Sequence, residues 1–125
     1  MLPLDLFEPD PEPVARLVNL SAETRHIQGS MGERIRWWLA QSPDHRYIGR
    51  GSPLGNPYSH LASSAAQFQV RTRDEAVDKY RPYLLARADL LAYLETLRGT
   101  VMGCWCVPKR CHGEVLLEFL NKWPL

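Results

Sequence analysis

The chain has 125 residues, of which 45% are hydrophobic, and its 15 basic residues nearly balance its 14 acidic ones. This balance argues against wholesale electrostatic binding of DNA or anionic membranes. No apolar run approaches the roughly 20 residues of a membrane-spanning helix, and the acidic, proline-rich start does not resemble a secretory signal. We therefore expect a cytoplasmic protein that does not associate with membranes.

The first half of the chain predicts an arm followed by alternating short elements. Prolines over residues 1–13 indicate an extended arm, and one hydrophobic core at this length predicts a single domain over residues 14–125. Val14–Leu20 is rich in aliphatic residues and predicts a strand. The spacing of apolar residues predicts a helix over Ser30–Gln41, and Arg46–Arg50 predicts another short strand. Residues 59–69 are small and polar, which predicts an irregular loop.

The second half predicts three helices and one strand. Arg73 begins the clearest helix, with acids in its first turn, and Pro82 predicts a kink or a break into two helices. A further helix is expected over Ala88–Leu97, a strand over residues 100–106, and a closing helix from Gly113. Strands that alternate with helices predict a small α/β domain, in which a sheet is flanked by helices and strand-to-helix junctions carry the motifs.

The glycine-rich stretch "YIGRGSPLGNP" is the first candidate for binding. Its glycines allow close backbone approach, and Arg50 and Asn56 supply hydrogen-bond donors, as in loops that bind phosphates. The spacing matches neither a dinucleotide fingerprint nor a Walker loop. A structural turn in which Pro53 and Pro57 fix the backbone is therefore an equal alternative.

The stretch "MGCWCVPKRCHGE" holds all three cysteines of the chain. On a strand, Cys104 and Cys106 would point to one face and Trp105 to the other. Three interpretations remain open: inert packed thiols, a zinc site formed by Cys104, Cys106, Cys111 and His112, or a reactive centre. In the reactive centre, Cys111 at a helix start would be the catalytic thiolate, and His112 would be the general acid or base.

Three ordered blocks between Tyr47 and Leu120 carry a resemblance. "YIGRGSPLGNP", "RTRDEAVDKYRPYL" and "LRGTVMGCWCVPKRCHGEVLLEFL" together resemble an uncharacterised domain family found in phages and bacteria. The resemblance marks residues in all three blocks: Gly49, Arg50, Gly55, Asn56 and Pro57; Arg73, Tyr80 and Arg81; Cys104, Cys106, Pro108, Cys111, His112 and Gly113. Either Arg71 or Arg73 fits the arginine of the second block. The resemblance implies no established reaction.

Guanidinium groups beside thiols are not required by packing, so we expect the blocks to converge on one cleft. The leading hypothesis is a small enzyme that acts on a phosphate-bearing, nucleotide-related or nucleic-acid substrate. Cys111 and His112 would be catalytic, and the substrate would be bound by Gly49, Arg50, Gly55, Asn56, Arg73 and Arg81. The alternative is a non-catalytic, zinc-stabilised module that binds protein or nucleic acid, with zinc closed inside four ligands and no cleft near Arg50. The sequence leaves the oligomeric state open.

Overall fold

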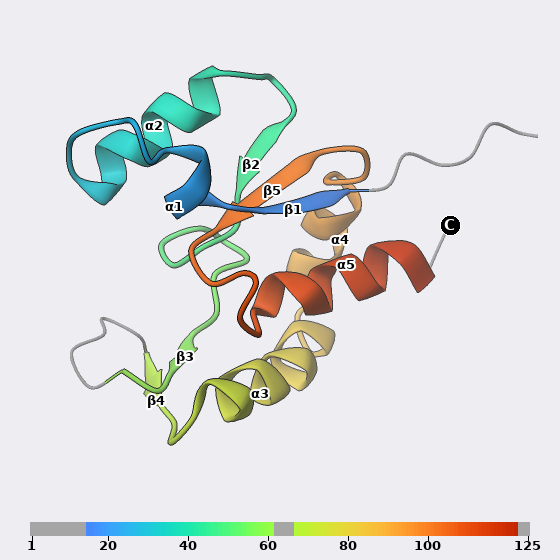
Figure 1. Cartoon of the computed structure of the whole chain (residues 1–125). Helices are drawn as coiled ribbons and strands as arrows, with labels where there is room; N and C mark the ends of the chain where they lie inside the picture. The colour runs from blue at the N-terminus through green and yellow to red at the C-terminus, as the bar shows by residue number, and fades with distance from the viewer. Residues whose placement is uncertain (1–14, 62–66, 123–125) are drawn as a thin grey trace, which may run out of the picture.

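The computed structural model describes residues 15–61 and 67–122, so the predicted arm over residues 1–13 lies outside the described residues. Helices and parallel strands alternate along the chain, which confirms the predicted α/β class (Figure 1). In chain order, the elements are β1 (Arg16–Asn19), α1 (Leu20–Glu23), α2 (Met31–Ala40), β2 (His45–Tyr47), β3 (Tyr58–Ser59), β4 (Phe68–Gln69), α3 (Arg73–Leu85), α4 (Ala88–Glu95), β5 (Val101–Cys104) and α5 (His112–Lys122).

The main sheet has three parallel strands in the order β1-β5-β2, so the last strand of the chain lies in its centre. Asn19 pairs with Cys104 and Tyr47 pairs with Gly103, which places the carboxyl ends of all three strands at one edge. This edge is where parallel sheets commonly present ligand-binding loops. Both of the motif-bearing loops leave the sheet here.

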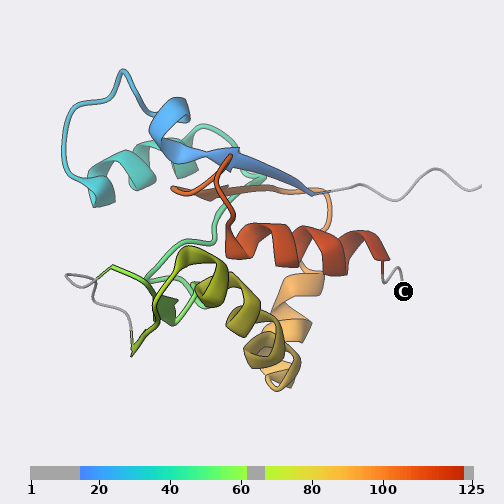
Figure 2. The ribbon, with the colours of Figure 1, turned by 60° about the horizontal axis from the view of Figure 1, so that its bottom comes forward.

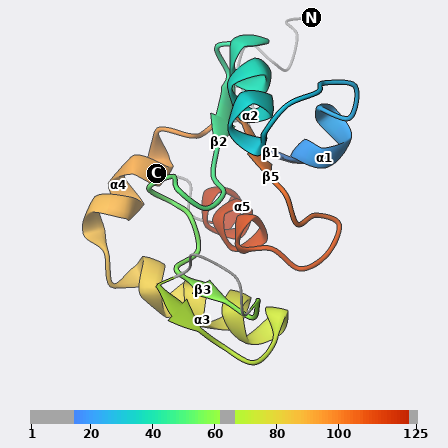
Figure 3. The ribbon, with the colours of Figure 1, turned by 90° about the vertical axis from the view of Figure 1, so that its left-hand side faces the viewer.

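Helices cover both faces of this sheet (Figure 2). On one face lie α1 and α2, and their core consists of Leu20 and Trp38 packed with Val101 of the sheet. On the other face lies α5, with α3 and α4 packed against it (Figure 3). The larger core, which includes Tyr80, Leu84, Met102 and Leu116, fills the space between these three helices and the sheet. None of the helices in the described part of the chain is long and apolar enough to cross a membrane.

Local sequence signals explain where the helices begin. The Ser30 side chain accepts a hydrogen bond from the Glu33 backbone N–H, and the Glu33 carboxylate accepts one from the Ser30 N–H, which forms a capping box for α2. At the start of α3, the Thr72 side chain accepts a hydrogen bond from the Glu75 N–H. These caps satisfy donors that have no partner within the helix.

The structure corrects several predicted details. Helix α3 continues through Pro82 without a break, and the predicted strand over Arg46–Arg50 is instead His45–Tyr47. The region predicted as irregular contributes to two parallel two-residue strands, β3 and β4. Such short pairings leave little periodicity in the sequence, because two residues cannot establish an alternation.

Candidate functional site

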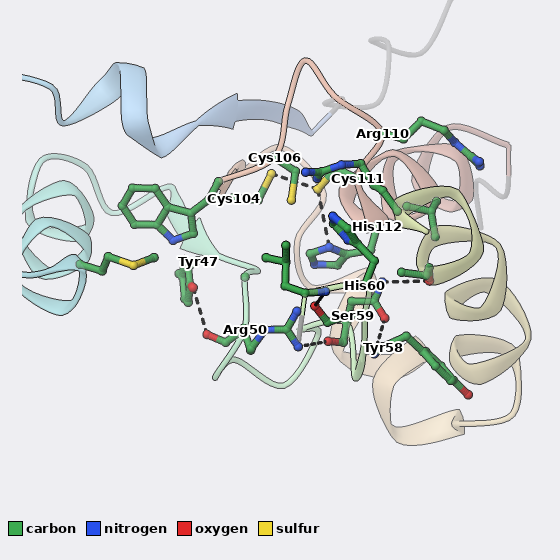
Figure 4. Close-up of a pocket in the computed structure, with 18 residues that line it drawn as sticks. Tyr47, Arg50, Tyr58, Ser59, His60, Cys104, Cys106, Arg110, Cys111 and His112 are labelled. Carbon is green, nitrogen blue, oxygen red and sulfur yellow. Dashed lines mark hydrogen bonds between the residues drawn. The ribbon is translucent and has the colours of Figure 1, made fainter. Parts of the chain in front are cut away.

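A pocket of about 400 Å³ lies at the carboxyl edge of the sheet, between the loop after β2 and the loop after β5 (Figure 4). The two loops are far apart in the sequence, and the start of α3 completes the wall. Twelve of the 18 lining residues belong to three chemical groups: Arg50, His60, Arg73, Arg110 and His112; the sulfur-bearing Met31, Cys104, Cys106 and Cys111; and the aromatic Tyr47, Tyr58 and Trp105. None of the described residues that line the pocket is acidic. The predicted convergence of the blocks on one cleft is thus observed.

The loop after β2 folds back on itself, and Gly55 permits this. A Cβ atom at Gly55 would lie 2.7 Å from the Gly49 carbonyl oxygen, which is too close for any side chain. The Tyr47 hydroxyl donates to the Arg50 carbonyl oxygen at 3.0 Å, and Arg50 Nη1 donates to the Asn56 carbonyl oxygen at 2.9 Å. These bonds hold the Arg50 guanidinium over the loop while its side chain remains exposed.

Asn56, predicted as a substrate-binding residue, is buried and bonded to backbone at both ends of its amide. Nδ2 donates to the Ala76 carbonyl oxygen of α3 at 3.0 Å, and Oδ1 accepts from the Tyr58 N–H at 2.9 Å. The buried Tyr80 hydroxyl makes a second connection from α3, to the Leu54 carbonyl oxygen at 2.6 Å. Asn56 therefore links the loop to α3 through a buried hydrogen bond.

The three cysteines meet where β5 ends and α5 begins. Cys104 is the last residue of β5, and its Sγ lies 3.1 Å from Sγ of Cys111, the residue immediately before α5. The Gly113 N–H donates to Cys111 Sγ at 3.4 Å, so Cys111 stands at a helix start as predicted. Because the strand ends at Cys104, the predicted alternation does not continue, and Trp105 lines the same pocket as the cysteines.

The hydrogen bonds among these sulfurs decide where a negative charge is favoured. Bonds from the Cys104 and Cys111 thiols, together with the nearby charge of Arg73, hold the pKa of Cys106 well below its usual range. Hydrogen bonds with Cys104, its strongest partner, and with Cys106 raise the pKa of Cys111, and burial raises it further. The contacts favour Cys106 as the thiolate, and the catalytic assignment of Cys111 stays a prediction.

His112 is buried at the first position of α5. Its Nε2 lies 2.6 Å from the Ile48 carbonyl oxygen, which can only accept, so Nε2 carries the proton. Burial lowers the pKa of His112 below its ordinary value, and the hydrogen bond to Ile48 opposes this only in part. The imidazole is therefore neutral, and its unprotonated Nδ1, 3.6 Å from Cys111 Sγ, accepts a hydrogen bond from the Cys111 thiol.

The cysteines and His112 are also candidate ligands for a metal ion. Within residues 15–61 and 67–121, no group of three or more His, Cys, Asp or Glu side chains is arranged to hold a metal ion. His112 Nε2 is occupied by Ile48, which leaves only Nδ1 for a ligand bond. The zinc set of Cys104, Cys106, Cys111 and His112 remains a prediction.

The arginines near the site differ in how far their charge is neutralised. Arg110 makes ion pairs with Asp74 and Asp78, both at 3.0 Å. Arg73 lines the pocket and makes no side-chain hydrogen bond or ion pair within the part of the chain that the structure describes. Arg81, also predicted as a substrate-binding residue, is exposed, pairs with Glu118 and does not line the pocket.

Several lining residues were not predicted. Met31 belongs to α2, on the opposite face of the sheet from α3, and His60 directly follows β3. Tyr47 stands within the first block, and Trp105 and Arg110 stand within the third, so these three lining residues had a signal in the sequence.

Comparisons with known proteins agree with the sequence blocks. The chain is 33% identical over 79 residues to the "Uncharacterized 12.4 kDa protein in nrdA-td intergenic region" of Enterobacteria phage T4. This alignment covers 60% of the chain and 66% of the phage protein, so the chain spans slightly less than two thirds of that relative. No solved structure matches the chain. The model of the family described as "Domain of unknown function (DUF4326)" matches residues 33–122, and the chain therefore belongs to this family.

Proposed function

We propose that the protein is a small enzyme that binds a phosphate-bearing, nucleotide-related ligand in the pocket at the carboxyl edge of the sheet. The observation that carries the proposal is the composition of the pocket wall, in which three arginines and two histidines stand without any acidic residue among the described lining. A closed zinc module would have no cleft beside Arg50, whereas here Arg50 shares a pocket with Cys111 and His112.

Arg73 is the strongest candidate to bind the negatively charged phosphate of the ligand. Arg110 is already paired with Asp74 and Asp78, so it offers little net attraction. Arg73 has its guanidinium donors available, and Arg50 uses one of its five for the Asn56 carbonyl oxygen. A guanidinium group binds phosphate through two parallel hydrogen bonds, which suits an anion held between two arginines.

The size and the apolar part of the pocket favour a nucleotide over phosphate alone. A volume of about 400 Å³ lies within the range of small-molecule sites and exceeds what a single phosphate fills. Tyr47, Trp105 and Met31 provide aromatic and apolar surface on which a base can stack. In the view of Figure 4, Arg50 and the cysteine sulfurs lie on opposite sides of the pocket, with His112 between them.

Cys106, in the loop after β5, and His112, at the start of α5, supply reactive groups in addition to binding. The half-buried Cys106 offers a nucleophilic sulfur, and His112 Nδ1 offers a proton acceptor next to the Cys111 thiol. Both line the pocket, so both would face a bound ligand. This arrangement suits nucleophilic or acid–base catalysis on the ligand.

Isothermal titration calorimetry with nucleoside 5′-monophosphates and with inorganic phosphate tests the proposal. We expect Arg73→Gln to weaken binding of the monophosphates at least about tenfold, which corresponds to about 1.4 kcal/mol. Arg71→Gln is the matched control, because Arg71 is exposed two residues away and does not line the pocket. Equal loss in both variants, or no binding of any probe by the wild-type protein, would overturn the proposal.

A further inference from the structure

Three thiols with unequal access to solvent meet at one point of the fold. All three line the pocket, but Cys104 and Cys111 are each 1% exposed, whereas Cys106 is half-buried. Cys104 Sγ and Cys111 Sγ lie 3.1 Å apart. They belong to different elements, the end of β5 and the residue before α5.

We propose that the three cysteines form a thiol–disulfide relay, in which Cys106 reacts with a hydroperoxide in the pocket and the oxidation ends as a Cys104–Cys111 disulfide. The proposal needs no bound nucleotide and does not rest on the proposed function. It uses the cysteines as a redox centre, which a metal site or inert packing would not do.

Each step of the relay is balanced. The Cys106 sulfur attacks one oxygen of hydrogen peroxide, the O–O bond breaks, and the products are a Cys106 sulfenic acid and water. The thiol of Cys104 or Cys111 then attacks the sulfenic sulfur, which forms a disulfide to Cys106 and releases a second water. The remaining thiol displaces Cys106 by thiol–disulfide exchange, and Cys106 is recovered as a thiol. In sum, two thiols are oxidised and one peroxide is reduced to two waters.

The geometry favours this end point. A disulfide bond is about 2.05 Å long, so Cys104 and Cys111 sulfurs need to approach by only about 1 Å. The segment between them, residues 105–110, is outside any helix or strand and can accommodate this shift. All three cysteines line the pocket, but Cys106 is half-buried while Cys104 and Cys111 are each 1% exposed, so peroxide in the pocket meets Cys106 most readily.

The first experiment treats the reduced, chelator-dialysed protein with one equivalent of hydrogen peroxide and counts thiols with Ellman's reagent under denaturing conditions. We expect three thiols to fall to one. Cleavage with chymotrypsin after Trp105 and with trypsin after Lys109 and Arg110 places each cysteine on its own peptide, and non-reducing peptide mapping should then join Cys104 to Cys111 and leave Cys106 free. Three thiols that persist after peroxide treatment, or a final disulfide that contains Cys106, would overturn the proposal.

The second experiment tests Cys106 as the entry point. We expect Cys106→Ser to form the disulfide at least about tenfold more slowly than the wild-type protein, while the double variant Cys104→Ser/Cys111→Ser should accumulate a dimedone-reactive sulfenic acid at Cys106. Dimedone added to the wild-type protein at early times should label Cys106 first, which keeps the test valid if a variant folds poorly. An unchanged rate in Cys106→Ser, or first labelling at Cys104 or Cys111, would contradict the relay. Stoichiometric zinc that shields all three thiols before dialysis would also contradict it.

Discussion

Gly103, in the centre of β5, shows how a single residue connects the site to the core. A Cβ atom at this position would lie 2.7 Å from Leu20 Cδ2 and 2.8 Å from the Trp38 ring. The residue precedes Cys104, so the packing of α1 and α2 on the sheet fixes where the sulfur cluster begins. The need for glycine at position 103 comes from Leu20 and Trp38, which are remote in the sequence, so the third block alone did not reveal it.

Gly103→Ala should lower the free energy of unfolding by about 1–3 kcal/mol, because the added methyl group overpacks a fully buried site. Urea denaturation followed by far-UV circular dichroism measures the change. Gly32→Ala is the control, since a Cβ at Gly32 meets its nearest neighbour, Arg36 Nη1, at 3.6 Å. Equal stability of the two variants would show that Gly103 is not tightly packed.

His112 should make the protein less stable in mild acid. Burial holds its folded-state pKa below the ordinary value of 6.5, so the unfolded chain binds a proton more readily than the folded one. The stabilisation is complete above pH 6.5 and is lost as the pH falls through 6.5 toward the folded-state pKa. Tyr80, Cys106 and Arg50 are the titratable or charged groups near the imidazole. A variant that replaces His112 alone leaves these groups unchanged, so its difference from the wild-type protein reports on His112.

His112→Gln keeps an N–H donor for the Ile48 carbonyl oxygen but cannot titrate. We expect the melting temperature of the wild-type protein to fall more steeply between pH 7.5 and 5 than that of this variant. Differential scanning calorimetry measures both curves in the same buffers. Parallel curves would contradict a buried neutral imidazole.

At the residue scale, the sequence located much of the site because the chemistry is concentrated in short blocks. Arg50, Arg73 and the Cys/His cluster all line the pocket. Met31 and His60 could not be found in this way, because they reach the pocket through tertiary packing and belong to no block. Arg81 followed from the resemblance alone, and its position on α3 turns it toward Glu118 of α5.

At the scale of elements, the contact between the β2 loop and α3 depends on one buried amide. Asn56→Ala removes hydrogen bonds to two backbone groups, and leaving such groups unsatisfied costs about 1–3 kcal/mol. We expect a loss of this size in urea denaturation, with Asn121→Ala, an exposed change on α5, as the neutral control. If Asn56→Ala keeps its stability and loses only ligand affinity, Asn56 contacts the ligand directly.

Pro82 shows why local rules misjudged α3. A proline removes one backbone hydrogen bond, here the one to the carbonyl oxygen of Asp78. Both Pro82 and Asp78 are exposed, so water can satisfy that carbonyl. The helix continues because Ala76, Tyr80 and Leu84 pack in the core on its other side. The proline predicted a kink or a break into two helices, and the helix continues without a break because its other side packs in the core.

At the scale of the whole molecule, the strand order creates the site. The sequence predicted strands and helices in nearly the right places, but the insertion of β5 between β1 and β2 depends on contacts between distant segments. Because all three strands are parallel, this insertion brings the loop after β2 and the loop after β5 to one edge. The sequence blocks predicted that the two loops converge on one cleft, whereas the strand order and register that bring them together are seen only in the structure.

The most direct test of the central claim is a ¹H–¹⁵N correlation spectrum of the protein titrated with a nucleoside 5′-monophosphate. We expect chemical-shift changes at the backbone amides of Gly49, Arg50, Cys106 and His112, which belong to both loops, and at the side-chain Nε–H of Arg73. Changes confined to the separate groove beside Leu91 and Phe119, or no changes at millimolar ligand, would contradict a ligand site at the carboxyl edge of the sheet.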